Sequence, residues 1–318
     1  MKEVSTNLPT YFGLPGRGAK DRGGYICKAE GGLVRIFKTN DSPTVIGKRY
    51  GLLQGLAAAG LVNIDKIYLS RHGQPYINLG RDTYVMMQLV RGRELDFNSR
   101  EEVKTVVQAL AGFHKAARGK GFGLPVAAPI PEVWRKENIS LTQALKQAQR
   151  SSKLSDFDVL VIKNAPMYID AAVASAEALA ATDYIALQRD AISQGAICHN
   201  IIKEENLLIT AAGCFITNFV DSSYDLQLVD LAGFIRRYIK HSNRIISIGG
   251  IAEIYDEISP LPGTAQDILR ALLAYPWPFA KIVKEYYSKK RGWTPIGTMS
   301  RLVSVLEEQP IIEKYLKA

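Results

Sequence analysis

Two polar residues at a fixed separation, His199 and Asn206, are the clearest sign of chemistry in the sequence. They flank a polar turn that leads into the apolar residues 207–209. This order is typical of loops that transfer a phosphoryl group, in which an aspartate shortly after the histidine accepts the proton of the attacking hydroxyl. The position of that aspartate is Ile201, whose side chain has no lone pair to accept a proton. If the segment is such a loop, as its outline resembles, we expect it to lack the base.

A second segment, residues 215–221, resembles the strand that carries the metal-binding aspartate of such sites. Its aspartate position is Asn218. An amide oxygen can coordinate a cation, but it adds no negative charge to a magnesium ion held between phosphates. Asp221 follows three residues later and could act as a substitute if the strand end shifted. We expect no functional metal site, with weak binding of ATP and magnesium as the alternative.

Phosphoryl transfer also requires a lysine on the third strand, held by an acidic residue of the next helix. Lys38 is the best candidate, and Arg35 is the second choice. Residues 43–60 contain no Asp or Glu, so this helix cannot supply the usual acidic partner. The glycine-rich residues 13–18 favour an ordinary loop over a phosphate-binding one. Lys38, Asn206 and Asn218 would then mark a vestigial nucleotide site.

The N-terminal residues 1–90 read as strands and turns with one helix. Two β-rich runs flank Gly31 and Gly32, a pair that predicts a hairpin. A helix is expected over residues 43–59, and further strands over 65–70, 76–79 and 84–90. After the turn at residues 91–94 the pattern becomes helical.

The remaining chain, residues 95–318, is expected to be mainly helical. Ser99 and Glu102 form a capping box that starts the first helix. A strand, turn and strand are expected within residues 196–230. Further helices are predicted over 166–189, 231–240, 265–275, 279–290 and 300–317. The sequence thus predicts an α+β, bilobal fold with a small β-rich N-terminal lobe (1–90), a hinge (91–94) and a larger, mainly helical C-terminal lobe (95–318).

Several polar residues are better explained by structure than by catalysis. Asp230 stands at the start of a helix, where a carboxylate caps free amides, and His114 lies on the apolar face of a helix. His199 and Asn206 could likewise do no more than hold their loop. Basic clusters at residues 236–240 and 289–291 read as solvated ends of amphipathic helices.

Composition limits the class of protein. The chain has 318 residues, of which 47% are hydrophobic and 22% charged, values typical of a folded globular protein. The three cysteines fit neither a disulfide framework nor a paired metal site and imply a reducing compartment. No signal-peptide core is visible, and no run approaches the length of a membrane span, so we expect a protein that is cytosolic when made. The net charge of +9 would suit nucleic acid, but no recognised nucleic-acid module is present.

The architecture and the residues 198–209 together resemble aminoglycoside phosphotransferases, choline kinases and their relatives in the protein-kinase-like superfamily. The C-terminal residues narrow this to a resemblance to the CotS family of bacterial spore coat proteins. The shared features are Asp-Leu-Ala-x-x-x-Arg-Arg at 230–237 and Pro-x-x-Phe followed by Tyr-Tyr at 276–287, with a Lys-rich turn and Trp293 after it. Phe113-His114 and the hinge at 89–93 extend the resemblance over most of the chain. The family's His-Gly-Asp signature is where this sequence departs from it.

The resemblance implies a protein made in the cytoplasm of the mother cell and then located in the spore coat, with other spore coat proteins as partners. The missing base, metal carboxylate and lysine partner favour a pseudokinase with a structural or assembly role. An ATP-dependent phosphotransferase that uses Asp221 or Glu205 in a non-standard site is the alternative. A basic nucleic-acid binder is the third hypothesis.

Overall fold

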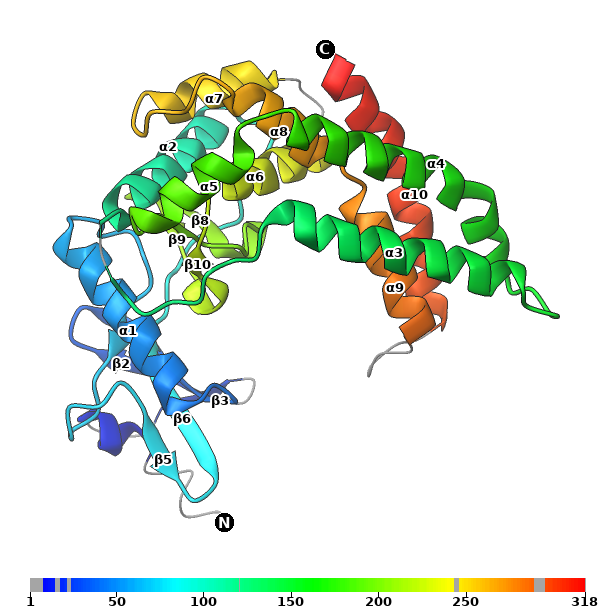
Figure 1. Ribbon diagram of the computed structural model, residues 1–318. Coiled ribbons are helices and arrows are strands. Elements are labelled where there is room, and N and C mark those ends of the chain that lie inside the picture. The colour runs from blue at the N-terminus through cyan, green and yellow to red at the C-terminus, as the bar shows by residue number, and fades with distance from the viewer. Residues whose placement is uncertain are drawn as a thin grey trace. The chain divides into compact units, whose positions relative to one another are not determined.

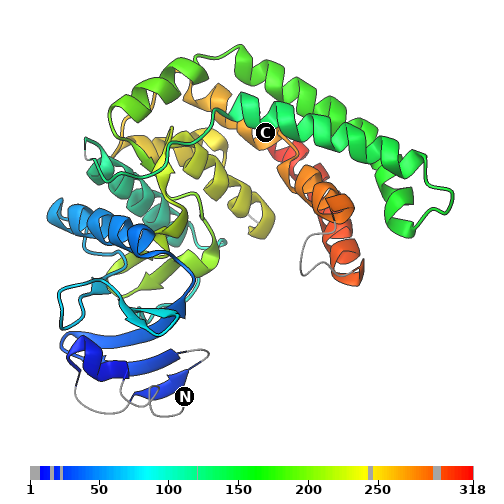
Figure 2. The same cartoon turned by 60° about the horizontal axis from the view of Figure 1, so that its bottom comes forward.

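The computed structural model describes residues 8–14, 18–21, 24–119, 121–242, 246–288 and 295–317 (Figures 1 and 2). Its contacts divide the chain into two compact units. The first unit comprises Met1–Pro125 and Gln194–Tyr224, and the second comprises Val126–Ser193 and Asp225–Ala318. The lobe boundary expected at residues 91–94 is a different division of the chain, and it stays a prediction.

An antiparallel sheet forms the N-terminal part of the first unit. The strands follow the order β1-β2-β3-β6-β4, and β5 pairs with the same strand β6. Their bounds are β1 Ala19–Asp21, β2 Gly24–Ala29, β3 Gly32–Thr39, β4 Ile67–Tyr68, β5 Ile77–Leu79 and β6 Asp82–Gln88. One face of β3 is buried through Val34 and Ile36, which pack in a cluster with the short helix η1 (Leu8–Phe12). The alternation of buried and exposed residues along β3 is that of a half-buried strand.

The expected hairpin and the expected helix are both confirmed. β2 and β3 meet at Gly31 and Gly32, whose φ angles of 88° and 140° are conformations that favour glycine. Helix α1 (Pro43–Ala58) begins at Ser42, whose side chain accepts a hydrogen bond from Val45 N–H. Figures 1 and 2 show α1 between the sheet and helix α2 (Arg100–Ala117).

The capping box expected at the start of α2 is only half formed. Ser99 accepts from Glu102 N–H as predicted. The Glu102 carboxylate does not return to Ser99; it binds the guanidinium of Arg93 through both oxygens and accepts from Asp96 N–H. The paired geometry of a guanidinium with a carboxylate explains why a distant arginine displaces the local amide.

The segment expected to contain a strand, turn and strand completes the first unit. It contains β7 (Ile197–Cys198), η2 (Glu204–Asn206), β8 (Leu207–Thr210), β9 (Gly213–Ile216), η3 (Phe219–Asp221) and β10 (Ser223–Tyr224). The β8–β9 hairpin is bonded to the N-terminal residues, because Arg93 and Ile209 exchange backbone hydrogen bonds and Ile216 N–H donates to Asn63. These long-range bonds place the hairpin in the first unit.

The second unit is helical. Its helices are α3 Ile130–Gln149, α4 Asp156–Ala180, α5 Tyr184–Ser193, α6 Leu228–His241, α7 Ile248–Asp256, α8 Ala265–Ala274, α9 Trp277–Ser288 and α10 Pro295–Lys317. α3 and α4 lie side by side (Figure 2) and share a core with α9 and α10. Aromatic stacks fill this core: the ring centroids of Tyr168 and Phe279 are 3.9 Å apart, and those of Phe157 and Tyr286 are 3.7 Å apart. The aromatic residues Phe279 and Tyr286 of α9 therefore pack against α4.

The helices predicted over 231–240, 265–275, 279–290 and 300–317 are confirmed as α6, α8, α9 and α10, with ends that shift by up to five residues, whereas the prediction for the first part of this unit is wrong. α3 and α7 were not expected, and the predicted helix over 166–189 is divided between α4 and α5. Ser155 starts α4 with a complete capping box to Asp158, so Pro166 lies inside the helix and not at its beginning. The helix start expected at residue 166 is therefore wrong, and α4 continues across Pro166 although proline has no amide donor for the helix.

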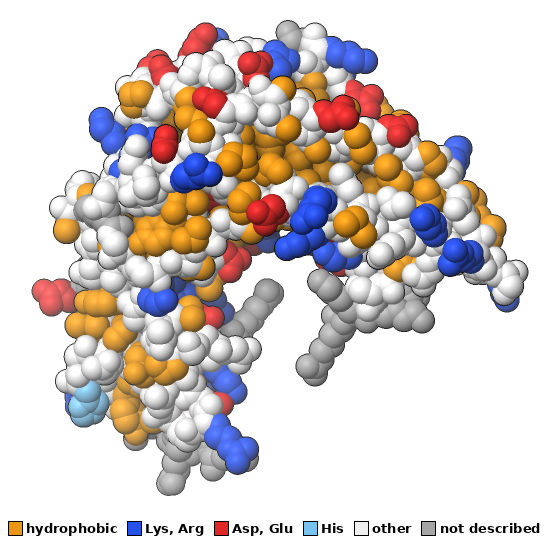
Figure 3. All heavy atoms as spheres, viewed as in Figure 1, with side chains coloured by type: hydrophobic (Ala, Val, Ile, Leu, Met, Phe, Trp, Pro, Cys, Tyr) orange, Lys and Arg blue, Asp and Glu red, His pale blue; other side chains and the backbone are white. Residues whose placement is uncertain are grey.

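α4 is also long and apolar enough, by length and composition alone, to span a membrane. The expectation that no run approaches this length is therefore wrong for α4. Its Phe157, Val161 and Tyr168 belong to the core of the second unit, whereas Met167 and Val173 are exposed. Figure 3 shows apolar side chains gathered over the region of α3 and α4. A helix of this composition also occurs in the core of soluble proteins, so it is weak evidence for a membrane span.

Candidate functional site

The loop between β7 and η2 keeps an unusual backbone conformation at the position of the family's glycine. Asn200 has a φ of 67°, in the left-handed region that glycine adopts freely and asparagine tolerates. Its Nδ2 donates to the carbonyl oxygen of Asp221 at 2.7 Å and to Ser223 Oγ at 2.8 Å. Asn200 thus keeps the turn and ties it to the end of η3. The sequence reasoning missed this residue, although an asparagine at a glycine position is a recognisable signal.

His199 is fully buried and holds the loop from within. Its Nε2 lies 2.8 Å from the carbonyl oxygen of Thr217, and Ile201 N–H donates to its Nδ1 at 3.2 Å. Since Nδ1 accepts, Nε2 carries the proton in this arrangement. The rings of Phe113 and Phe219 pack edge-on against the imidazole. These contacts support the structural role considered for His199.

Asn206 connects the two ends of the predicted catalytic loop. The residue is buried, and its Nδ2 donates to the carbonyl oxygen of Ile201 at 3.0 Å. Its own carbonyl oxygen accepts from Thr217 N–H at 2.9 Å. The backbone of Ile201, the residue predicted to stand at the base position, is therefore held by both His199 and Asn206, while its side chain offers only carbon atoms.

Asn218 lies next to a buried acid that the sequence reasoning had placed in a strand. It is exposed, has a φ of 68°, and donates its backbone N–H to the Asp65 carboxylate. Burial raises the pKa of Asp65 to about 6, against the opposing effects of this hydrogen bond and of Arg49. Asp65 is 7% exposed, and its carboxylate accepts a hydrogen bond from the backbone of Asn218. The two residues are far apart in the chain, so no local pattern predicts their contact.

Asp221, the possible substitute at the metal position, and Lys38, the predicted phosphate-binding lysine, are both exposed to solvent. Asp221 is exposed at the end of η3, and the atom that Asn200 contacts is its backbone carbonyl oxygen. Lys38 is half-exposed, and its Nζ lies 2.7 Å from Asp82 on β6. The Asp82 carboxylate raises the pKa of Lys38. Asp82, a residue of the sheet, thus takes the place of an acidic partner on α1.

Helix α1 carries a buried cation where an acid would be expected. Arg49 is 8% exposed, and its Nη1 lies 3.2 Å from the carboxylate of Asp41, which precedes the helix. Arg35, the second-choice phosphate-binding residue, pairs with Asp21 on β1 at 3.0 Å. Arg49 on α1 and Arg35 on β3 are therefore each paired with a carboxylate of this chain.

The residues shared with the spore coat family in the second unit have packing roles. Asp230 is buried in the first turn of α6, and the structural role expected for it stays a prediction. Arg236 was expected on a solvated face, and this is wrong. Its Nη2 donates to the carbonyl oxygens of Leu272, Leu273 and Tyr275, at 3.2, 2.7 and 3.0 Å. Arg236 therefore satisfies the free carbonyls at the C-terminal end of α8.

Two predicted features fall partly outside the described residues. Of the glycine-rich segment, residues 15–17 are outside the described part, as are residues 289–294, which include the basic cluster at 289–291 and Trp293. His114 is buried beside Phe113, as expected for a packed histidine.

The arrangement does not suit a magnesium ion between phosphates. Asn206 and Asn218 could offer amide oxygens, but neither brings the negative charge that such an ion favours. Within the part of the chain that the structure describes, no group of three or more His, Cys, Asp or Glu side chains could hold a metal ion. The residues at the base and metal positions thus lack the carboxylates on which phosphoryl transfer depends.

Comparison with solved structures identifies the fold. An aminoglycoside phosphotransferase from Alicyclobacillus acidocaldarius is similar with a TM-score of 0.81 at 18% identity, over 95% of this chain and 90% of that chain. A spectinomycin phosphotransferase is similar with a TM-score of 0.72 at 13% identity, over 98% of this chain and 96% of that chain. The predicted α+β, aminoglycoside-phosphotransferase-like fold is confirmed.

Comparison with sequences identifies the family. The endospore coat-associated protein YutH of Bacillus subtilis (strain 168) is 23% identical over 183 residues, which are 56% of this chain and 53% of that protein. The match thus spans about half the length of this curated relative. The family described as "Spore coat putative kinase YutH" matches residues 6–318. Since that match covers nearly the whole chain, the chain belongs to the YutH family of spore coat proteins with a kinase-like fold.

Proposed function

We propose that the chain is a pseudokinase of the spore coat, with a structural or assembly role and no phosphoryl transfer. The observation that carries this proposal is Ile201 at the base position, within a loop whose frame is intact. His199 and Asn206 keep their loop contacts, so the lost base is a change of side chain and not a collapse of the loop. A loop that stays folded without a base can still support a structural or assembly role, because such a role depends on the shape of the protein and not on proton transfer.

The electrostatics of the first unit support the same proposal. Phosphoryl transfer depends on metal ions that neutralise developing charge and on a lysine that an acid positions. Asn218 supplies no charge at the metal position, and Lys38 pairs with Asp82. α1 carries Arg49 and no acidic residue. Three independent parts of the machinery are therefore altered together.

The proposed place of action follows from the family. The relative is described as endospore coat-associated. We therefore infer that this chain is made in the cytoplasm of the mother cell, joins the spore coat and contacts other spore coat proteins there. The three cysteines are all buried and none is joined in a disulfide, which suits a chain folded in a reducing compartment.

An active phosphotransferase is the alternative. It would need a carboxylate from Asp221 or Glu205 to replace the missing base or metal ligand. Both side chains are exposed, and Glu205 lies 3.7 Å from Lys203. Neither is held toward Ile201 by a hydrogen bond that the described residues provide, whereas positioning supplies most of the acceleration in this chemistry.

Nucleotide binding and transfer should be measured separately on the full chain. We expect ATP with magnesium to shift the melting temperature little or not at all, and radiolabelled phosphate to reach neither candidate sugars nor coat proteins. Robust transfer that Asp221→Ala or Glu205→Ala abolishes would overturn the proposal. Strong retention on DNA at physiological salt would instead favour the nucleic-acid hypothesis.

A further inference from the structure

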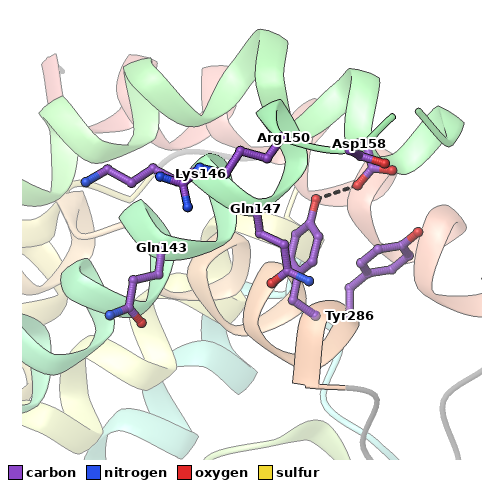
Figure 4. Close-up of a pocket in the computed structure, with 8 residues that line it drawn as sticks. Gln143, Lys146, Gln147, Arg150, Asp158 and Tyr286 are labelled. Carbon is purple, nitrogen blue, oxygen red and sulfur yellow. Dashed lines mark hydrogen bonds between the residues drawn. The ribbon is translucent and has the colours of Figure 1, made fainter. Parts of the chain in front are cut away.

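A cavity in the second unit lies outside the catalytic-loop region. It has a volume of about 680 Å³, within the ~300–1,000 Å³ typical of small-molecule sites. The C-terminal half of α3, the start of α4 and the end of α9 form its walls (Figure 4). The lining residues are Gln143, Lys146, Gln147, Arg150, Ser151, Asp158, Tyr286 and Tyr287.

The floor of the cavity is fixed by a network of side-chain hydrogen bonds. Tyr287 donates its hydroxyl to Asp158 Oδ1 at 2.6 Å, the bond drawn as a dashed line in Figure 4. Ser155 donates its hydroxyl to Asp158 Oδ2 at 2.6 Å and its N–H at 2.9 Å. The hydroxyl of Tyr286 lies 3.0 Å from Ser155 Oγ. The two aromatic rings are therefore held in place before any ligand arrives, which lowers the entropy cost of binding.

The same hydrogen bonds stabilise the negative charge of the Asp158 carboxylate. Burial by itself would raise the pKa of Asp158, but the hydrogen bonds from Ser155 and Tyr287 together lower it. The carboxylate is thus ionised at neutral pH and already surrounded by donors. Its 7% exposure leaves little of it for a ligand to meet.

The positive charges of the cavity have no such partners. Lys146 and Arg150 are one helical turn apart on α3, and Figure 4 shows both side chains extending along the same side of that helix. Within residues 8–14, 18–21, 24–119, 121–242, 246–288 and 295–317, neither forms an ion pair. Two like charges at this spacing repel each other unless an anion lies between them.

The uncharged lining residues point to a hydroxylated ligand. Gln143 and Gln147 are exposed on the same face of α3, and a carboxamide both donates and accepts hydrogen bonds, as a sugar hydroxyl requires. Tyr286 and Tyr287 add rigid rings with an apolar body, against which the C–H face of a sugar can pack. Cations, amides and aromatic rings thus line one pocket that is open to solvent.

We propose that this cavity binds an anionic sugar, a polyhydroxylated ring that carries one carboxylate or one phosphate. Lys146 and Arg150 bind the anionic group, Gln143 and Gln147 bind hydroxyls, and the two tyrosines receive the ring. This inference is independent of the proposed loss of phosphoryl transfer, because it involves no residue of the catalytic loop.

The test is calorimetric titration of the full chain with glucuronic acid, glucose 6-phosphate, glucose and inorganic phosphate. We expect both acidic sugars to bind at least about tenfold more tightly than glucose or phosphate alone, since charge-assisted hydrogen bonds add to those of the ring. The comparison of glucuronic acid with glucose 6-phosphate identifies which anionic group is preferred. Lys146→Ala combined with Arg150→Ala should weaken acidic sugars by about tenfold or more.

The matched control is Lys136→Ala combined with Lys163→Ala, which removes two exposed cations outside the cavity and should leave binding unchanged. Gln147→Ala should weaken the acidic sugars and leave phosphate binding unaffected. Three results would overturn the proposal: glucose binding as tightly as glucuronic acid, equal losses in both double variants, or a pentaglutamate peptide displacing the sugars at lower concentration. The last result would assign the cavity to an acidic peptide.

Discussion

Replacement of Asn200 tests whether the degenerate loop is held as described. Asn200→Ala removes the two hydrogen bonds to Asp221 and Ser223, each worth about 1 kcal/mol at most at this partly exposed site. It also places a Cβ without a compensating polar group at a φ of 67°, at a cost of about 1 kcal/mol. The expected loss in free energy of unfolding is therefore about 2–3 kcal/mol.

Asn200→Gly separates the two contributions. Glycine loses the same hydrogen bonds and gains chain entropy in the unfolded state, but it adopts a positive φ without strain. We expect a loss of about 1–2 kcal/mol, so glycine should be the milder replacement. Urea unfolding followed by circular dichroism measures both losses, and the amide hydrogen exchange of Ile201 reports the loop itself.

Lys203 provides a matched control in the same loop. Its φ of −134° is extended backbone, where alanine has no strain and glycine only adds entropy. There the order should reverse, with Lys203→Gly less stable than Lys203→Ala. If Asn200→Ala were as stable as Asn200→Gly, or more stable, the positive φ of Asn200 would not strain an alanine at this position.

Three further predictions concern stability. Arg236→Met should cost about 2–4 kcal/mol because it leaves three carbonyl oxygens without their donor, whereas Arg301→Met, which removes a surface ion pair, should cost under about 1 kcal/mol; urea midpoints compare them. Since the pKa of Asp65 is raised to about 6, the folded state holds this proton more tightly, and stability should fall as pH rises from about 4 through 6. This fall in the free energy of unfolding should be on the order of 3 kcal/mol, and Asp65→Asn should remove it. Melting temperatures measured across this pH range compare the two proteins. Gly24→Ala should lower stability by about 1–3 kcal/mol, because its Cβ would lie 2.2 Å from the carbonyl oxygen of Ile36, and an unchanged melting temperature would contradict this.

The local features of the fold were predictable because short-range physics determines them. Gly31 and Gly32 mark a hairpin through their positive φ angles, and Ser99 begins a helix through its side-chain oxygen. The spacing of His199 and Asn206 predicted a loop between them. The structure shows that both side chains bind the backbone of Ile201 within this loop. Each of these inferences needs only residues that are close in the chain.

Predictions failed where a distant partner overrides a local preference. Glu102 was expected to bond back to Ser99, but Arg93 takes its carboxylate. The start expected at Pro166 failed for a different reason, since the capping box of Ser155 and Asp158 that begins α4 earlier is a local signal that the prediction missed. Arg236 was expected in solvent, and the carbonyls of α8 bind it.

By itself, the sequence determined that Ile201 offers no proton acceptor and Asn218 no negative charge, because the identity of a side chain limits its chemistry wherever it lies. That these two residues occupy the base and metal positions stays a prediction. Only the tertiary structure decided what surrounds them. Asp65 meets the backbone of Asn218, and Lys146 shares a cavity with Tyr287, across long stretches of chain. Such pairs form when separate helices and strands pack, and packing depends on the shapes of whole elements, which no local spacing records.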